Sequence, residues 1–219
     1  MKSVVHVHIP VSARVCARVF ARGLAHASIP HRSFLLAAAL GVLCIAGCGG
    51  ASSRGAASPP PADAIDPVAP HRAWTYDVSV FGPSSVCAPG RHDGKVTRED
   101  VVDGKHAYEV ASFCPGMPSF FYAFDGDRVE LDYKGQWVLA LDTPVQEGTT
   151  WSNGAGSFTW HDAGKVTVPA GTFSQCWRAT ENASFTAYTV FCRGVGAVRW
   201  YRKDEQGNGF DAQLVAKNF

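Results

Sequence analysis

From Arg72 onward the sequence repeats a single pattern, in which short runs with alternating apolar and polar residues are separated by turn residues. Trp74, Tyr76, Val78 and Val80 show the alternation, which has the period of a half-buried strand. Asp103-Gly104 is a typical hairpin turn because both positions readily adopt a positive φ. No amphipathic helical period follows Cys48. The sequence therefore predicts an all-β domain.

The number of such runs limits the architecture further. We count about ten to twelve short strands, joined by turn signals at short intervals, which is typical of an antiparallel meander. A twisted sheet of that length has to curl, split into two sheets or close. A sandwich remains possible, but we expect one strongly bent sheet or an open barrel.

The chain before this domain has an uncharged, mostly apolar run from Ser33 to Cys48. It is shorter than the roughly 20 residues of a membrane-spanning helix and fits the core of a signal peptide. It ends in Ile45-Ala46-Gly47-Cys48, which resembles the bacterial lipobox, an aliphatic residue and two small residues before a cysteine that receives a lipid. The resemblance implies removal of residues 1–47 and acylation of Cys48, for example with palmitate.

Charge and composition change at this cysteine. All 19 acidic residues follow Cys48, together with 15 of the 20 Lys and Arg, so the processed chain has a net charge near −4. This argues against nucleic acid as a partner, since its binders present a basic face. Residues 48–71 are rich in Gly, Ala, Ser and Pro and predict a flexible tether. We expect the folded domain to span residues 72–219.

The location follows from the same features. A lipidated cysteine predicts a protein held on a membrane of the cell envelope by its lipid. Gly49 stands where an Asp would resemble an inner-membrane retention signal, so we expect sorting to the outer membrane where the organism has one.

Four cysteines lie in the predicted domain, Cys87, Cys114, Cys176 and Cys192, an even number in a chain expected to be exported. In an oxidising compartment they predict two disulfides, and of the three possible connectivities we favour Cys176–Cys192 and Cys87–Cys114. A zinc site is the alternative, but the sequence has no C-x-x-C pair.

The hairpin expected between residues 174 and 193 tests this pairing. If Cys176 faces Cys192, Trp177 faces Phe191 and Thr180 faces Tyr188, which places a disulfide and an aromatic pair on opposite faces.

Two segments resemble a loosely defined group of uncharacterised bacterial lipoproteins. One is Val166-Thr167-Val168-Pro169-Ala170-Gly171-Thr172-Phe173 and the other is Phe191-Cys192-Arg193-Gly194-Val195-Gly196-Ala197-Val198. The resemblance implies a bent antiparallel sheet, distantly similar to the lipoprotein-carrier folds of the periplasm. It implies no catalytic residue.

The sequence contains no G-x-S-x-G nucleophile motif and no H-E-x-x-H metal motif. Four histidines follow Cys48 and are scattered singly: His71, His92, His106 and His161. A hydrolase would need one of them, most plausibly His161, beside a carboxylate or a serine. Asp204 to Asp211 resembles a calcium loop but lacks its last acidic ligand. We expect no cofactor, no metal and no enzymatic activity.

The aromatic run Phe120, Phe121, Tyr122 and Phe124 has two interpretations. It could line a groove for a lipid or a partner, but adjacent apolar residues favour burial in the core. The leading hypothesis is a non-enzymatic binding or structural module of the envelope, for a protein partner or an apolar ligand. A lipid or lipoprotein carrier is the alternative, and it would require a deep apolar cavity.

Overall fold

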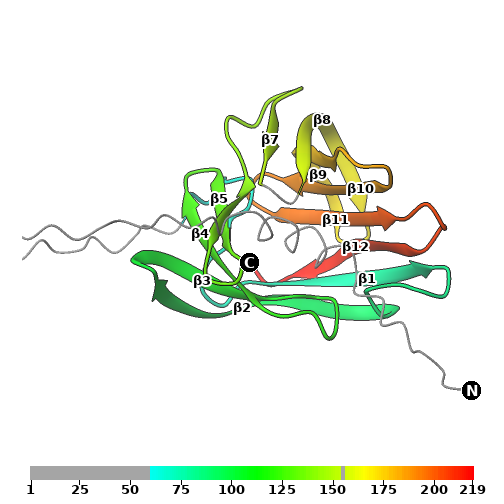
Figure 1. Ribbon diagram of the computed structural model, residues 1–219, viewed down its shortest axis with the longest axis horizontal. Coiled ribbons are helices and arrows are strands. Elements are labelled where there is room, and N and C mark those ends of the chain that lie inside the picture. The colour runs from blue at the N-terminus through cyan, green and yellow to red at the C-terminus, as the bar shows by residue number, and fades with distance from the viewer. Residues whose placement is uncertain (1–59, 154–155) are drawn as a thin grey trace, which may run out of the picture.

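The computed structural model describes residues 60–153 and 156–219, which form one antiparallel sheet of twelve strands (Figure 1). The sheet consists of two runs of consecutive strands, β1 to β6 and β7 to β12, which are joined by pairing of β1 with β12. The strand order is β6-β5-β4-β3-β2-β1-β12-β11-β10-β9-β8-β7. The bounds are β1 (Ala73–Phe81), β2 (Gly90–Val102), β3 (Lys105–Ala111), β4 (Phe120–Asp125), β5 (Arg128–Asp132), β6 (Trp137–Leu141), β7 (Thr150–Ser152), β8 (Ser157–Val168), β9 (Gly171–Glu181), β10 (Thr186–Cys192), β11 (Gly196–Lys203) and β12 (Gly209–Lys217). The predicted all-β meander is confirmed.

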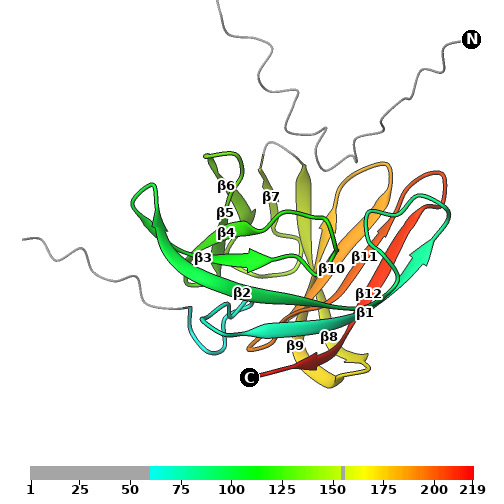
Figure 2. The same cartoon turned by 90° about the horizontal axis from the view of Figure 1, so that it is seen from below.

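The sheet curls until its two edge strands approach each other, so that it forms a nearly closed barrel (Figure 2). The contact between the edges comes from two tryptophans. Trp151 on β7 donates its indole N–H to Ala140 O on β6 at 3.2 Å, and Trp160 on β8 donates to Asp142 O at 3.1 Å. Side chains thus take the place that a twelfth row of backbone hydrogen bonds, between β6 and β7, would fill in a closed barrel.

The hairpin of β9 and β10 has the predicted register. Cys176 pairs with Cys192, Trp177 with Phe191, and Thr180 with Tyr188. The cysteine pair and the aromatic pair belong to two different hydrophobic clusters, as alternation along the strands requires.

Both predicted disulfides are present. Cys176–Cys192 joins neighbouring strands, with its Cα atoms 4.0 Å apart. Cys87–Cys114 joins the loop after β1 to the loop after β3, with Cα atoms 4.7 Å apart. The second bridge therefore holds together two loops at the same end of the barrel.

The segment from residue 60 to residue 71, which the sequence places in the flexible tether, packs against the barrel in the structure. Ile65 is fully buried in a cluster with Val129 and Trp160. Its backbone N–H donates to Asp127 Oδ1 at 2.9 Å, and Gly194 N–H donates to Ala64 O at 3.0 Å. The packed part of the chain thus starts before residue 72 and includes Ala64 and Ile65, because these residues have apolar and polar partners far away in the sequence.

The predicted signal peptide, the lipid-acceptor Cys48 and the first part of the tether lie outside the described residues. No helix in the part of the chain that the structure describes is long and apolar enough to cross a membrane.

Candidate functional site

The barrel contains an open cavity of about 1070 Å³. Because the strands alternate in direction, the loops after β1, β3, β9 and β11 lie at one end of the barrel, and residues from each of them line the cavity: Ser84, Ser85 and Val86, Ser112 to Met117, Phe185, and Asp204 and Asn208. The segment that contains Ile65 and Asp66 lies at the opposite end, beside the turn after β10. We call these two ends the mouth and the floor of the cavity.

The walls of the cavity are mainly aromatic and aliphatic. They include side chains from β4, β7, β8, β11 and β12, among them Phe120, Trp151, Phe158, Trp200 and Phe210. Cavities of this kind, apolar with a few polar groups, are the usual sites for small apolar ligands, and this one is at the upper end of their size range.

The aromatic run on β4 contributes to both the core and the cavity. Phe120 and Tyr122 line the cavity, whereas Phe124 packs against Tyr108 and Phe121 lies under the guanidinium of Arg98. Both interpretations thus apply to part of the run: Phe120 and Tyr122 line the cavity, and Tyr122 and Phe124 also pack against the hydrophobic core.

The floor carries polar groups of its own. Asp66 is half-buried because its side chain faces this enclosed space, and its carboxylate makes no hydrogen bond or ion pair within the described part of the chain. Tyr76 on β1 donates its hydroxyl to Ala197 O at 2.7 Å, and Trp74 donates its indole N–H to Val195 O at 2.7 Å. These two hydrogen bonds hold the floor to the beginning of β11.

Burial controls ionisation at the floor. Loss of hydration raises the pKa of Asp66 from 3.8 to about 7. Burial also raises the pKa values of Tyr76 and Tyr122 well above their usual range, and the Asp66 carboxylate raises both of them further. The Trp200 indole N–H beside the Tyr76 hydroxyl opposes part of that shift. Both tyrosines therefore stay neutral, while Asp66 changes charge near neutral pH.

Gly196 allows the floor to form. It has a φ of +87°, and a Cβ at this position would lie 2.9 Å from Asp66 Oδ1 and 3.4 Å from Trp74 Nε1. A side chain there would strain the backbone and push Asp66 away from the strand.

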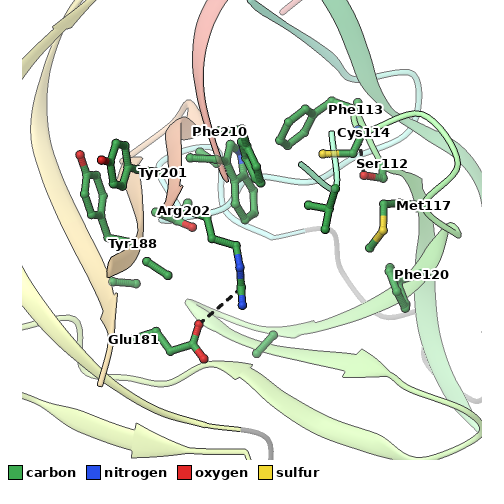
Figure 3. Close-up of a pocket in the computed structure, with 18 of the residues that line it drawn as sticks. Ser112, Phe113, Cys114, Met117, Phe120, Glu181, Tyr188, Tyr201, Arg202 and Phe210 are labelled. Atoms are coloured by element: carbon green, nitrogen blue, oxygen red, sulfur yellow. Dashed lines mark hydrogen bonds and ion pairs between the residues drawn. The ribbon is translucent and has the colours of Figure 1, made fainter. Parts of the chain in front are cut away.

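The mouth has one ion pair that faces the cavity. Arg202 Nη1 on β11 lies 3.9 Å from Glu181 Oε2 on β9, and both side chains extend toward the side of the cavity that Met117 and Phe120 line (Figure 3). The Arg202 guanidinium carbon also lies over the Phe185 ring, 4.4 Å from its centroid. Burial raises the pKa of Glu181, and Arg202 partly offsets that rise.

The histidines that a hydrolase would need do not converge. His106 pairs with Glu99, and His161 Nδ1 lies 3.0 Å from Glu147 Oε1, a carboxylate whose pKa is lowered chiefly by the Asp162 N–H. His92 contacts the carbonyl oxygens of Ala88 and Pro89. None of these three, nor His71, lines the cavity. His161 therefore lies beside a carboxylate, as a hydrolase would need, but neither His161 nor Glu147 lines the cavity.

No three His, Cys, Asp or Glu side chains within residues 60–153 and 156–219 come close enough together to hold a metal ion. The segment that resembles a calcium loop is a turn instead. Asp204 accepts a hydrogen bond from the Asn208 backbone N–H at 2.7 Å, which lowers the pKa of Asp204.

Sequence reasoning missed the floor of the cavity. Asp66 lies in a Pro- and Ala-rich stretch whose composition predicts a tether, so the sequence does not indicate its carboxylate as a site residue. The signal that could have identified it is the apolar set around it, Ile65, Pro67 and Val68, in a segment that otherwise has few large apolar residues.

The sequence matches no protein-family profile and no curated protein sequence. Several solved structures are similar in fold. A "putative lipoprotein" from Parabacteroides distasonis is 12% identical, with a TM-score of 0.42, and the match covers 71% of this chain and 99% of that one. A "putative exported protein with YmcC-like fold" from Bacteroides fragilis is 8% identical, with a TM-score of 0.43, and covers 70% and 98%. MucB is 10% identical, with a TM-score of 0.31, and covers 68% and 53%.

Proposed function

We propose that this chain is a lipid-anchored protein of the cell envelope whose barrel binds an apolar ligand in its cavity. The anchor is the acylated thiol of Cys48, and the outer membrane is the expected destination. The signal-peptide pattern, the lipobox resemblance and the absence of acidic residues before Cys48 support this part of the proposal.

The cavity is the single observation that supports ligand binding. A purely structural module would be expected to fill its interior, since protein cores are packed as densely as organic crystals. Here about 1070 Å³ remains between aromatic and aliphatic walls. An elongated apolar molecule would bury its surface there and remove these walls from water, which is favourable. The cavity also favours the carrier alternative, which required such a space.

The outer surface gives little support for a protein partner. Among the described residues only two large hydrophobic side chains are exposed, Val86 at 37% and Val101 at 63%. Val86 is at the mouth and Val101 lies on β2, so they do not form the contiguous apolar patch that marks a protein interface. An apolar ligand in the interior therefore accounts for more of the structure than a protein partner does.

Filling the cavity tests the proposal. Ala187 is buried on β10 and lines the cavity, so Ala187→Trp would occupy space that a ligand needs. We expect it to weaken the binding of the neutral apolar dye N-phenyl-1-naphthylamine, measured by fluorescence titration, by about tenfold or more, or about 1.4 kcal/mol.

Ala216→Trp is the matched control, because Ala216 is exposed on β12 and does not line the cavity. This variant should bind the dye within about twofold of the natural protein, given that surface changes are usually nearly neutral. Equal binding by both variants, or no dye binding by the natural protein, would contradict a ligand site in the barrel.

A further inference from the structure

The ion pair at the mouth of the cavity has unused hydrogen-bonding capacity. Arg202 Nη1 and Glu181 Oε2 are 3.9 Å apart, which is too far for a hydrogen bond, and the two side chains are only 27% and 20% exposed. Neither side chain makes a hydrogen bond to any other group within residues 60–153 and 156–219. The guanidinium N–H donors and the carboxylate oxygens therefore remain available, and Figure 3 shows the two charged groups facing each other among the side chains that line the cavity.

Packing holds both charged groups in place. The guanidinium carbon of Arg202 lies 4.4 Å from the centroid of the Phe185 ring, so the ring covers one face of the guanidinium. The N–H groups lie in the guanidinium plane and point outward from its edge, which the ring leaves free. On the other side of the pair, a Cβ at Gly156 would lie 3.3 Å from Glu181 Oε1, so the backbone passes close to the carboxylate. The positions of both groups are thus defined before a ligand enters.

A ligand that fills the cavity has to deal with this pair. Charged groups in an open cavity are hydrated, and a hydrocarbon chain packed against them would displace that water. Removing a charged group from water is costly unless another polar group takes the place of the water. A ligand that fits the whole cavity therefore carries polar atoms where Arg202 and Glu181 lie.

The two groups together define which polar atoms fit. A guanidinium can only donate and an ionised carboxylate can only accept, so their common partner has to accept from one and donate to the other. A hydroxyl does both. Because Arg202 Nη1 and Glu181 Oε2 are 3.9 Å apart, one hydroxyl oxygen fits at about 2.9 Å from each of them. A neighbouring hydroxyl would reach a second N–H or the other carboxylate oxygen.

We propose that Arg202 and Glu181 form a head-group site for an uncharged lipid with neighbouring hydroxyls, such as a monoacylglycerol or a glycolipid. This inference rests on the proposed function. A hydroxyl of the head group accepts a hydrogen bond from Arg202 and donates one to Glu181. The acyl chain lies along the apolar walls of the cavity, beside Met117 and Phe120 (Figure 3).

Charged head groups fit this site less well. A carboxylate or phosphate would bind Arg202 but would also meet the Glu181 carboxylate beside it, and Asp204 is a further acidic side chain at the mouth. Among the described residues that line the cavity, Arg202 is the one basic side chain, so no second cation is present for an anion. An ammonium group would pair with Glu181 but would meet the guanidinium 3.9 Å from the same carboxylate.

Competition against bound N-phenyl-1-naphthylamine tests this assignment with probes whose chains have equal length: 1-decanoylglycerol, decyl glucoside, methyl decanoate, decanoate and decylamine. We expect one or both of the hydroxylated probes to displace the dye at a concentration about tenfold or more below that of methyl decanoate, the effect of one hydrogen bond to a charged group. Whether 1-decanoylglycerol or decyl glucoside binds more tightly shows which class of lipid the site takes.

A double variant removes the pair. Arg202→Met together with Glu181→Met takes away both charges, so that neither is left buried without its partner. This variant should bind 1-decanoylglycerol and methyl decanoate within about twofold of each other. The matched control is Arg98→Met together with Glu109→Met, because Arg98 Nε lies 2.9 Å from Glu109 Oε2 and its guanidinium lies over the Phe121 ring, but neither residue of this pair lines the cavity. The control should keep the preference of the natural protein.

A single variant gives a readout that does not depend on the double variant. Glu181→Gln keeps the size of the side chain and removes the negative charge that opposes an anion beside Arg202. Decanoate should therefore displace the dye from this variant at a concentration about threefold or more below that for the natural protein. Thermal unfolding of each variant shows whether it is folded, and Glu181→Gln decides the question if the double variant is not.

The outcomes separate the two proposals. If the natural protein does not bind the dye, the proposed function fails. If it binds the dye but prefers neither hydroxylated probe, or if the double variant keeps the preference, the head-group site is wrong. Unchanged decanoate binding by Glu181→Gln would also contradict it. Preferred binding of decanoate or decylamine by the natural protein would replace the uncharged head group with a charged one.

Discussion

Ile65→Ala tests whether packing of the N-terminal segment, residues 60–71, against the barrel stabilises the fold. The Ile65 side chain is fully buried, in contact with the cluster that contains Val129, Leu141 and Trp160. These neighbours are on hydrogen-bonded strands, so they cannot move in to fill the space that the shortened side chain leaves. Loss of buried methyl groups plus an unfilled space costs about 2–5 kcal/mol in comparable substitutions, and we expect about 3 kcal/mol here.

Urea unfolding followed by tryptophan fluorescence measures this loss, because Trp160 lies in the same cluster. Asp63→Ala is the control: Asp63 is exposed, and only its backbone carbonyl contacts the barrel, through Arg193. That variant should change the free energy of unfolding by less than about 0.5 kcal/mol, as surface substitutions usually do. A loss below about 1 kcal/mol for Ile65→Ala would refute the packed segment, since a flexible tether would not respond to the change.

Two other predictions concern charge and the anchor. Asp66 binds its proton more tightly in the folded state, because burial raises its pKa from 3.8 to about 7. The folded state then holds more protons than the unfolded state across this interval, so the free energy of unfolding should fall as pH rises from 3.8 to about 7. Asp66→Asn should remove this fall in urea titrations at several pH values, and parallel curves for the two proteins would contradict it. Separately, cells that express the full chain should incorporate labelled palmitate into it, and Cys48→Ser should abolish the label, whereas Cys44→Ser should not; an unlabelled natural chain would rule out the anchor.

The sequence by itself determined the strand pattern. Alternation along Trp74, Tyr76 and Val78 predicts β1, and all three are buried on one face. The register of β9 with β10 followed from pairing Cys176 with Cys192, because one register also joins Trp177 to Phe191. These features depend on residues that are close in the chain, where pairing is limited by the period of two and by short turns.

The tertiary structure alone decided how the sheet closes. Trp151 and Trp160 are visible in the sequence as large residues, but their indole N–H groups meet β6 and the residue after it only once the sheet has curled. The contact between the N-terminal segment and the barrel, at the floor of the cavity, likewise forms only in the tertiary structure. Ile65 reaches Asp127, 62 positions away, and no local pattern indicates such a contact.

The sequence could not predict the cavity either. Alternation shows which side chains face inward, but it does not show whether facing side chains meet, because that depends on the diameter of the curled sheet. Phe120 and Tyr122 have the composition of core residues and nevertheless line open space. Local pairing is encoded by neighbours in the chain, whereas enclosed volume depends on the closure of all twelve strands together.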